Sequence, residues 1–381
     1  MLYFWPMLGL LIKDYYLDFA AHVPTSKQAV REFVKYSSPM YGNANSIHRY
    51  GIRARKALNL CKKTLRITLQ SKSDTNVVFT SGGSESNELA IRSVHERWRN
   101  SSQEKPVAII SAIEHASIRS NHFLNDNFDV MEIPVDSKGY VAMDTLEKQL
   151  EKTDSVAFVS IIFQSSEIGT TQNCSRIGSL VRKYKNNNRF PYFHCDASQG
   201  TMYNKLDVQK MGTDLLTLCG QKFGSVQGSG VLIDVNNIVT RHGTPALATN
   251  AAFTKAFVLA QENVTVLKSA ICGIKSRFVD LLKEMNISFL INGDIASPSG
   301  IINITFNTCT KDSEQLVVAF DSQGLAVSSK SACMGSQVHD SYVLGALGST
   351  RANSIRFTLH HDLTENDLKN IVSRIAKVVN D

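Results

Sequence analysis

Short apolar runs alternate with helix-like segments along most of this chain, and this alternation is the feature that most limits its fold. The runs are too short for buried helices, which predicts strands. Strands that alternate with helices form a mostly parallel sheet with helices on both faces. The sequence therefore predicts an α/β fold with a seven-stranded sheet. We expect its strands at residues 76–80, 107–111, 130–134, 156–162, 192–195, 215–218 and 230–233, with helices at 85–99 and 175–184.

The pattern of strand-like and helix-like segments changes beyond Thr244. A long helix, two short strands and an amphipathic C-terminal helix are expected there. Their predicted ranges are 251–268, 300–306, 325–328 and 365–379.

We place a domain boundary near residue 250. A large α/β domain is expected over residues 15–250 and a smaller α+β domain over residues 251–381. The N-terminal segment 1–14 is expected to be a packing extension. Its apolar run is too short to span a bilayer, and it lacks a basic region and a small-residue cleavage site.

Charge and cysteine content exclude several classes of protein. The 381 residues carry a formal net charge of +7, but Lys and Arg are scattered, apart from small clusters at 53–63 and 182–189. We therefore expect no nucleic-acid partner. No stretch predicts a membrane span. The seven cysteines are odd in number and lack the paired spacing of zinc ligands, which predicts no metal site and a reducing, cytoplasmic location.

An acid and a lysine follow two neighbouring apolar runs. Asp196 closes one run, and Lys222 comes three residues after the run that ends at Cys219. Ligands bind at the carboxyl ends of parallel strands, so both side chains should meet in one crevice. Pyridoxal phosphate requires such a pair: the lysine holds its aldehyde as a Schiff base and the acid keeps its ring nitrogen protonated. A structural ion pair is the alternative from these two residues alone.

A glycine-rich turn precedes the helix expected at 85–99. The sequence TSGGSESN occupies residues 80–87. Glycines let the backbone approach a ligand closely, and the N–H groups of a helix start attract phosphate. Ser84 can add a hydroxyl donor, or it can serve only as a cap of its own helix.

Three further residues are candidates for chemistry. His115 follows a strand end, where it can stack on a cofactor ring or simply form a hydrogen bond in the core. Cys333 lies in a small polar run, which suits a nucleophilic thiol, although buried inert cysteine is common. Arg356 lies between apolar residues and needs an anionic partner, either a substrate carboxylate or an internal Asp or Glu.

In this order, the segments resemble the cysteine desulfurases of the IscS/NifS type, within the class V aminotransferase superfamily. The similarity runs from Tyr16 to the C-terminal helix. It rests on the ordered set GNANSIH, TSGGSESN, IEHAS, SEIGTTQ, HCDASQ, GQK, RHGT, SSKSAC and SIRF. The resemblance implies fold type I of the pyridoxal-phosphate enzymes and a homodimer. It also implies removal of sulfur from L-cysteine, which gives L-alanine and an enzyme persulfide for Fe–S cluster assembly or tRNA thiolation, with a sulfur-acceptor protein as partner.

The resemblance also implies a role for each matching residue. Lys222 matches the Schiff-base lysine, Asp196 the partner of the pyridine nitrogen, and Gln199 the partner of the phenolic oxygen. The positions that match phosphate-binding residues of the same subunit are Gly83, Ser84, Cys219 and Gln221.

The remaining matches concern the second subunit and the substrate. Thr244 matches a threonine that reaches the cofactor phosphate of the partner subunit. His115 matches the histidine that stacks on the cofactor and transfers protons. Ser166 lies at a position that contacts cofactor and substrate, and Arg356 matches the arginine that binds the substrate carboxylate. Cys333 matches the thiol that receives sulfur.

The chain also departs from the family pattern at the site. Ser166 stands where Asn is usual, and Cys219 and Gln221 replace a Ser and a His. Lys330 replaces a glycine, and the Gly-rich segment before RHGT is missing, which leaves a short link over residues 234–240. A lost contact to a charged phosphate costs about 1–3 kcal/mol. We therefore expect a divergent but working enzyme.

Two alternatives remain open at this point. One is another pyridoxal-phosphate enzyme of class V, such as a selenocysteine lyase or an aminotransferase. Transamination needs no thiol, so Cys333 argues against that reaction. The other is a catalytically impaired scaffold paralogue, which the departures at Ser166 and Gln221 favour.

Overall fold

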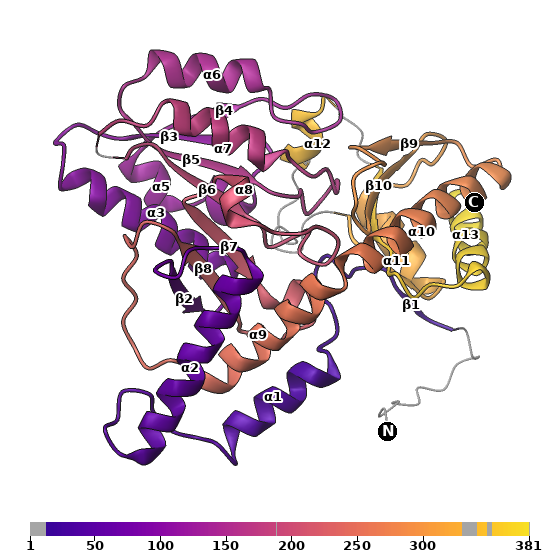
Figure 1. The fold of residues 1–381 in the computed structure, drawn as a ribbon. Helices are drawn as coiled ribbons and strands as arrows, with labels where there is room; N and C mark the ends of the chain where they lie inside the picture. The colour runs from indigo at the N-terminus through magenta and orange to yellow at the C-terminus, as the bar shows by residue number, and fades with distance from the viewer. Residues whose placement is uncertain (1–12, 188, 330–340, 349–352, 381) are drawn as a thin grey trace.

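A seven-stranded sheet forms the larger part of the molecule, and a three-stranded sheet lies beside it (Figure 1). The computed structural model describes residues 13–187, 189–329, 341–348 and 353–380. Strand order in the large sheet is β2-β8-β7-β6-β5-β3-β4. These strands are β2 (Asn76–Thr80), β3 (Val107–Ser111), β4 (Asp129–Ile133), β5 (Val156–Ile162), β6 (Tyr192–Asp196), β7 (Leu215–Cys219) and β8 (Gly230–Asp234).

Strand β8 runs against the other strands of this sheet. It pairs antiparallel with both β2 and β7. The pairs from β7 across to β4 are all parallel. The predicted mostly parallel seven-stranded α/β sheet is therefore confirmed, and its strand ranges match to within one residue. The parallel strands bring their carboxyl ends to one edge, where the predicted site residues follow.

Helices cover both faces of the large sheet, as Figure 1 shows. The side chains of β3 alternate between two cores: Val107 and Ile109 belong to one, and Ala108 and Ile110 to the other. The first core includes residues of α2 (Arg49–Thr68), α6 (Met143–Lys152), α7 (Cys174–Lys183), α8 (Val208–Met211) and α9 (Leu247–Glu262). The second includes residues of α3 (Gly83–Arg99), α4 (Ala116–Arg119) and α5 (His122–Asn127).

A separate core holds the smaller sheet. Strand β10 (Ile301–Phe306) lies between β9 (Phe289–Asn292) and β12 (Ser354–Thr358), and both pairs are antiparallel. Helices α10 (Val264–Glu284), α11 (Ser313–Ser322) and α13 (Glu365–Asn380) pack on this core. Strands β1 (Tyr15–Tyr16) and β11 (Leu325–Ala326) pair in parallel next to it. The short helix α12 (Tyr342–Ala346) packs instead against residues near the ends of β3 and β5.

The long helix predicted at 251–268 is wrong, because the chain bends there. Helices α9 and α10 meet at Asn263 with a bend of 68°. The side-chain Nδ2 of Asn263 donates a hydrogen bond to the carbonyl oxygen of Leu259 at 2.8 Å. Such side-chain hydrogen bonds compete with those of the helix backbone, which makes Asn unfavourable inside helices. Helix α9 packs in the core of the large sheet and α10 in that of the small sheet. The domain boundary near residue 250, which falls inside α9, stays a prediction.

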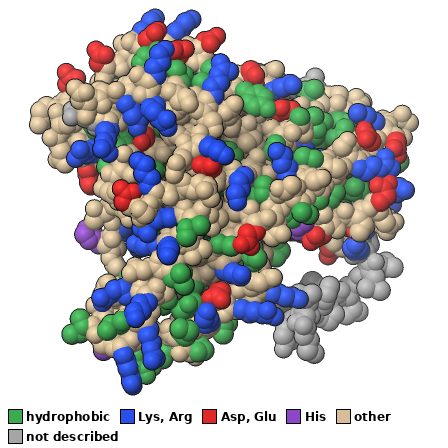
Figure 2. Space-filling model, viewed as in Figure 1, with side chains coloured by type: hydrophobic (Ala, Val, Ile, Leu, Met, Phe, Trp, Pro, Cys, Tyr) green, Lys and Arg blue, Asp and Glu red, His purple; other side chains and the backbone are tan. Residues whose placement is uncertain are grey.

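Helices α1 (Lys27–Ser37) and α2 project from the large sheet at the lower left of Figure 1. Apolar and basic side chains gather on this part of the surface (Figure 2). The exposed apolar residues of these helices and their connection are Val30, Val34, Met40, Tyr41, Ile47, Tyr50, Ile52, Leu60 and Ile67. Such a patch marks an interaction site more often than an ordinary monomer surface.

No single helix among the described residues has the length and apolar character to cross a membrane. The bent pair α9 and α10 passes the same test by length and composition.

The contact between α7 and α8 permits a test of the packing. A Cβ atom at Gly178 of α7 would overlap the carbonyl oxygen of Met211, so Gly178→Ala forces the helices apart. We expect this change to lower the free energy of unfolding by about 1–3 kcal/mol in urea unfolding. Gly273→Ala in α10 is the matched control, because its Cβ meets nothing within 4 Å. The control should raise stability by up to about 1 kcal/mol, since alanine favours a helix. Equal effects at both positions would contradict this packing.

Candidate active site

The carboxyl ends of β6 and β7 open onto one pocket. Residues from separate parts of the sequence line it: the segment after β1, the start of α3, the β3–α4 turn, the ends of β6 and β7, and β12. The structure brings together the predicted site residues Gly83, Ser84, His115, Ser166, Asp196, Gln199, Cys219, Gln221, Lys222 and Arg356.

Asp196 is the buried acid of this pocket, with 3% of its surface exposed. Its Oδ2 accepts a hydrogen bond from Asn87 Nδ2 at 2.8 Å, and its Oδ1 accepts one from the Ser198 N–H at 2.9 Å. These two donors fix the orientation of the carboxylate. Asn87 was not among the residues expected from the sequence, although it stands in TSGGSESN, four residues after Gly83 on α3 and so on the same helix face.

A chain of hydrogen bonds links His115 to this acid. Asn87 Nδ2 also donates to Ser117 Oγ at 2.8 Å, and Ser117 Oγ lies 2.8 Å from His115 Nδ1. The Ser117 N–H donates to the same Nδ1 at 3.1 Å. Because Nδ1 accepts, the neutral imidazole carries its proton on Nε2. His115 also caps α4, so the helix start fixes the position of its ring.

Lys222 and Gln199 converge on one stretch of backbone. Lys222 lies on the 3₁₀ turn Gly220–Lys222 after β7, and its Nζ donates to the carbonyl oxygens of Ala20 at 2.8 Å and Ala21 at 2.7 Å. Gln199 Nε2 also donates to the Ala20 carbonyl oxygen, at 2.8 Å. The short segment after β1 therefore holds the lysine at the mouth of the pocket.

The start of α3 forms the polar end of the pocket. A Cβ atom at Gly83 would lie 2.7 Å from Ser198 Oγ and 3.4 Å from Cys219 Cβ, so only glycine fits there without movement. Ser198 Oγ is buried and has no hydrogen-bond partner within the described ranges. Burial also raises the pKa of the Cys219 thiol, which keeps it neutral. This end offers neutral donors that suit an anionic group.

Arg356 has an internal acidic partner. It is 1% exposed on β12, its Nη2 lies 2.6 Å from Asp18 Oδ1, and its Nη1 donates to the Ser166 carbonyl oxygen at 2.9 Å. Its Nε is buried with no partner among the residues the structure describes. An internal acid was the alternative partner expected from the sequence, and Asp18 is that acid. Sequence did not identify Asp18, which lies more than three hundred positions away.

Glu114 is a buried acid that the sequence analysis did not assign. It is completely buried beside His115, and its Oε1 accepts from the Ile162 N–H at 2.5 Å and from Ser111 Oγ at 3.0 Å. Burial raises the pKa of this carboxyl to about 8, and the nearby Asp196 charge adds to the shift. Glu114 therefore joins the end of β5 to the turn that carries His115 while it remains protonated near neutral pH.

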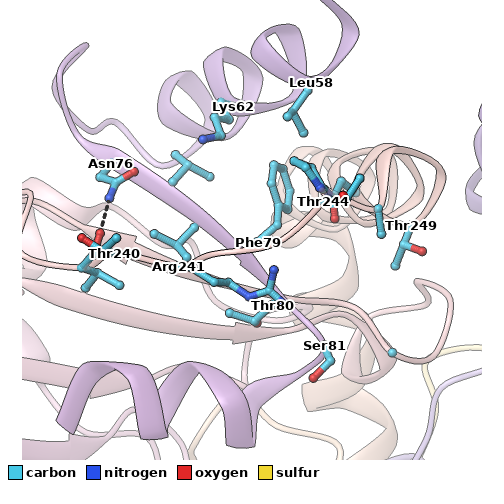
Figure 3. A pocket seen from close by; sticks show the side chains of 18 residues that line it. Leu58, Lys62, Asn76, Phe79, Thr80, Ser81, Thr240, Arg241, Thr244 and Thr249 are labelled. Atoms are coloured by element: carbon cyan, nitrogen blue, oxygen red, sulfur yellow. Dashed lines mark hydrogen bonds between the residues drawn. The ribbon is translucent and has the colours of Figure 1, made fainter. Parts of the chain in front are cut away.

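Of the predicted site residues that the structure describes, Thr244 does not line this pocket. It lines a second cavity between α2, β2 and α9 (Figure 3). Cys333 lies outside the described residues, as does Lys330.

Close to the pocket, the rings of His360 and His361 lie 3.9 Å apart, tilted by 35°, beside Asp362. The possible ligand atoms of these three residues lie within 4.8 Å of one another. Burial lowers the pKa of His360 to about 4, with a contribution from His361, so the ring is neutral at pH 7. His360 also stacks on Phe19 at 4.6 Å, which packs the group behind the backbone that holds Lys222. The sequence analysis did not identify this group.

Comparison with known proteins places this site in a family. The model of the aminotransferase class-V family matches residues 15–239, which contain every residue that lines the pocket except Arg356. The chain belongs to the class V aminotransferase family, whose members are pyridoxal-phosphate enzymes.

Among similar proteins of that family are named cysteine desulfurases. The chain is 28% identical to cysteine desulfurase IscS of Dictyoglomus turgidum, over 96% of this chain and 95% of that protein. It is 29% identical to cysteine desulfurase IscS of Shewanella sediminis, over 96% and 93% of the two chains. The structure of a NifS-like protein from Rickettsia africae superposes with a TM-score of 0.82 at 25% identity, over 97% of this chain and 100% of that one. The resemblance to the IscS/NifS branch is confirmed.

The protonation of Glu114 gives a test of the site's electrostatics. The ordinary pKa of this carboxyl is 4.5, and burial raises its pKa to about 8. Between these two pH values, the folded state keeps a proton that the unfolded chain loses. The folded state binds more protons there, so the free energy of unfolding falls as pH rises, by up to about 1.4 kcal/mol per pH unit.

We expect Glu114→Gln, which is neutral and keeps an acceptor oxygen, to flatten this fall in urea unfolding across that range. Glu104→Gln on the exposed surface is the control and should leave the slope unchanged. An unaltered slope in Glu114→Gln would show that Glu114 is ionised.

Proposed function

We propose that this protein is a pyridoxal-phosphate-dependent cysteine desulfurase, which takes sulfur from L-cysteine and gives L-alanine. The observation that carries the proposal is the convergence of Asp196, Lys222, Gln199 and His115 on one pocket. These residues come from three separate segments of the sequence, so their meeting is a property of the fold. The similarity to named cysteine desulfurases along nearly the whole chain supports the same reaction.

The pocket fits the cofactor by its chemistry. The buried, unpartnered Ser198 Oγ and the glycine cradle at Gly83 suit a phosphate, together with Ser84 at the first turn of α3. At the other end, the oriented carboxylate of Asp196 suits a protonated ring nitrogen. When bound, pyridoxal phosphate supplies an electron sink for the α-carbon of an amino acid.

Several residues of the pocket have a proposed role in this chemistry. Lys222 provides the amine that holds the cofactor, and Ala20 and Ala21 accept hydrogen bonds from this amine before the cofactor is attached. Gln199 is proposed to contact the phenolic oxygen. His115 is proposed to stack on the ring and to hold or release a proton at Nε2, the nitrogen that its hydrogen bonds leave protonated.

Sulfur transfer is assigned to Cys333. Its thiolate attacks the sulfur of the substrate, an S–S bond forms and the C–S bond breaks. The electron pair of that bond stays with carbon, which takes a proton to give alanine. A thiol near its ordinary pKa of about 8.5 is mostly protonated at pH 7, so a base has to remove its proton.

Arg356 is proposed to bind the substrate carboxylate. Its Nε is buried and has no partner within the described residues, so this N–H is available to a ligand. Its other contacts, to Asp18 and to the Ser166 backbone, orient the guanidinium. The Ser166 side chain lines the same pocket and is proposed to contact cofactor and substrate. Asp18 reduces the net charge that a carboxylate meets, so we expect weaker binding of cysteine than an unpaired arginine would give.

A homodimer is part of the proposal. Thr244 lies away from the pocket of its own chain, which is consistent with a threonine that serves the cofactor phosphate of a second subunit. The exposed apolar residues of α1 and α2 offer a surface for that subunit (Figure 2). A reducing compartment such as the cytoplasm suits the six described cysteines, which are all free. The sulfur acceptor, an Fe–S scaffold or a tRNA-thiolation factor, stays a prediction.

Alanine formation from L-cysteine tests the proposed function. The purified protein, with pyridoxal phosphate and a thiol reductant, should release alanine and sulfide in equal amounts over many turnovers. The same assay with L-selenocysteine separates a desulfurase from a selenocysteine lyase. A folded protein that binds the cofactor but forms no alanine would contradict the assigned substrate.

Two substitutions separate cofactor attachment from sulfur transfer. Lys222→Ala should abolish covalent attachment of the cofactor after borohydride reduction, measured by mass spectrometry, whereas Lys210→Ala on the surface should keep it. Cys333→Ala should keep the attachment and lower sulfide release by at least about a hundredfold, because the proposed acceptor of the sulfur is then missing.

Cys272→Ala is the matched thiol control. Cys272 is partly exposed on α10 and does not line the pocket, so its loss should leave activity unchanged. Full activity in Cys333→Ala would mean that another group receives the sulfur.

A further inference from the structure

Two histidines and an aspartate lie together on the turn between β12 and α13. His360, His361 and Asp362 are consecutive in the sequence. The Leu363 N–H donates to the His360 carbonyl oxygen at 3.3 Å, which closes the turn. The proposed function uses none of these residues. The spacing of the cysteines predicts no metal site, but this group contains no cysteine, and imidazole and carboxylate are common ligands of divalent metal ions.

One carboxylate lies between the two imidazoles. Nδ1 of His360 lies 3.3 Å from Asp362 Oδ2, and Nε2 of His361 lies 3.6 Å from Asp362 Oδ1. Both distances are longer than a charge-assisted hydrogen bond, which spans about 2.7–2.9 Å. Two ligand atoms of a tetrahedral zinc ion lie about 3.3–3.6 Å apart, because each is about 2.0–2.2 Å from the metal. The two contacts to the carboxylate therefore match the separation of metal ligands.

Neighbouring aromatic rings hold the two imidazoles in place. His360 stacks on Phe19 with 4.6 Å between the ring centroids. His361 packs edge-on against Tyr203 at 6.3 Å, and Tyr203 is itself buried. His361 Nδ1 is buried without a hydrogen-bond partner in the described ranges, so Nε2 is the nitrogen of this ring that an ion can reach. Rings that are already oriented lose little freedom when they bind a ligand.

The aspartate brings a negative charge to two neutral rings. The Asp362 side chain is 78% exposed, and its carboxylate pairs with no Lys or Arg in the part of the chain that the structure describes. Burial lowers the pKa of both histidines, which leaves the rings neutral at pH 7 with an electron pair for a metal ion. The Asp362 N–H lies 3.4 Å from His360 Nδ1, a long contact that an ion can displace.

We propose that His360, His361 and Asp362 bind a divalent transition-metal ion, and that Zn²⁺ is the ion expected. Zinc accepts two imidazoles and a carboxylate, with water in its fourth position. Asp362 is exposed, so water can reach that position. Mg²⁺ and Ca²⁺ take oxygen ligands, and two nitrogen ligands disfavour them. The proposal does not depend on desulfurase activity, because none of the three residues lines the candidate active-site pocket.

Titration of the cofactor-loaded protein with zinc tests the proposal. Isothermal titration calorimetry at pH 7, in the absence of cysteine, should show a site for one Zn²⁺ per chain and no binding of Mg²⁺. Asp362→Asn should weaken Zn²⁺ binding about tenfold or more, because the loss of a residue that only supports a ligand already costs about that much. Zn²⁺ should also raise the melting temperature of the wild type, and less so that of Asp362→Asn.

Two surface substitutions are matched controls. Asp321→Asn removes an exposed carboxylate from α11, and His122→Ala removes an exposed imidazole from α5. Both should leave the affinity for Zn²⁺ unchanged. Because Asp362 is exposed, Asp362→Asn should fold like the wild type, and its melting temperature without metal checks this.

Three results would overturn the proposal. The first is no binding of Zn²⁺ by the cofactor-loaded protein. The second is equal affinity in Asp362→Asn and the wild type, which would place the ion elsewhere, for example on thiols. The third is binding of Mg²⁺ as tight as that of Zn²⁺, which would mean that the imidazoles are not ligands.

Discussion

The buried carboxylate of Asp196 is the interaction on which the candidate site depends. It lies at the carboxyl end of a strand buried on both faces, where an unpaired charge would be costly. Asn87 and the Ser198 N–H satisfy it, and Asn87 connects it to His115 through Ser117. The sheet, helix α3 and the β3–α4 turn must therefore all be in place before the acid is oriented. This requirement couples the integrity of the fold to the chemistry of the pocket.

The two parts of the molecule meet at the pocket through Arg356. This side chain comes from the small sheet, yet it contacts Asp18 of the N-terminal segment and the backbone of Ser166 from the large part. The N-terminal segment also holds Lys222 through the carbonyl groups of Ala20 and Ala21. A change in the position of the small sheet would therefore move both Lys222 and Arg356, the proposed substrate arginine.

The departures from the family pattern fall at the polar end of the pocket and in the link after β8. Cys219 is buried with a raised pKa and cannot replace a hydroxyl donor well, whereas Ser198 Oγ supplies a donor nearby. The missing Gly-rich segment leaves the link beside β2, where it forms one wall of the second cavity.

The sequence by itself determined the sheet and most of the pocket. Its strand runs are short, apolar and separated by turns, so local pattern was enough to place β2 to β8 and the residues that follow them. Only the tertiary structure decided the partners. Asp18 reaches Arg356, Asn87 reaches Asp196, and Ala20 reaches Lys222 across long separations that no spacing rule encodes. The protonated state of Glu114 also depends on burial, which a local pattern does not contain.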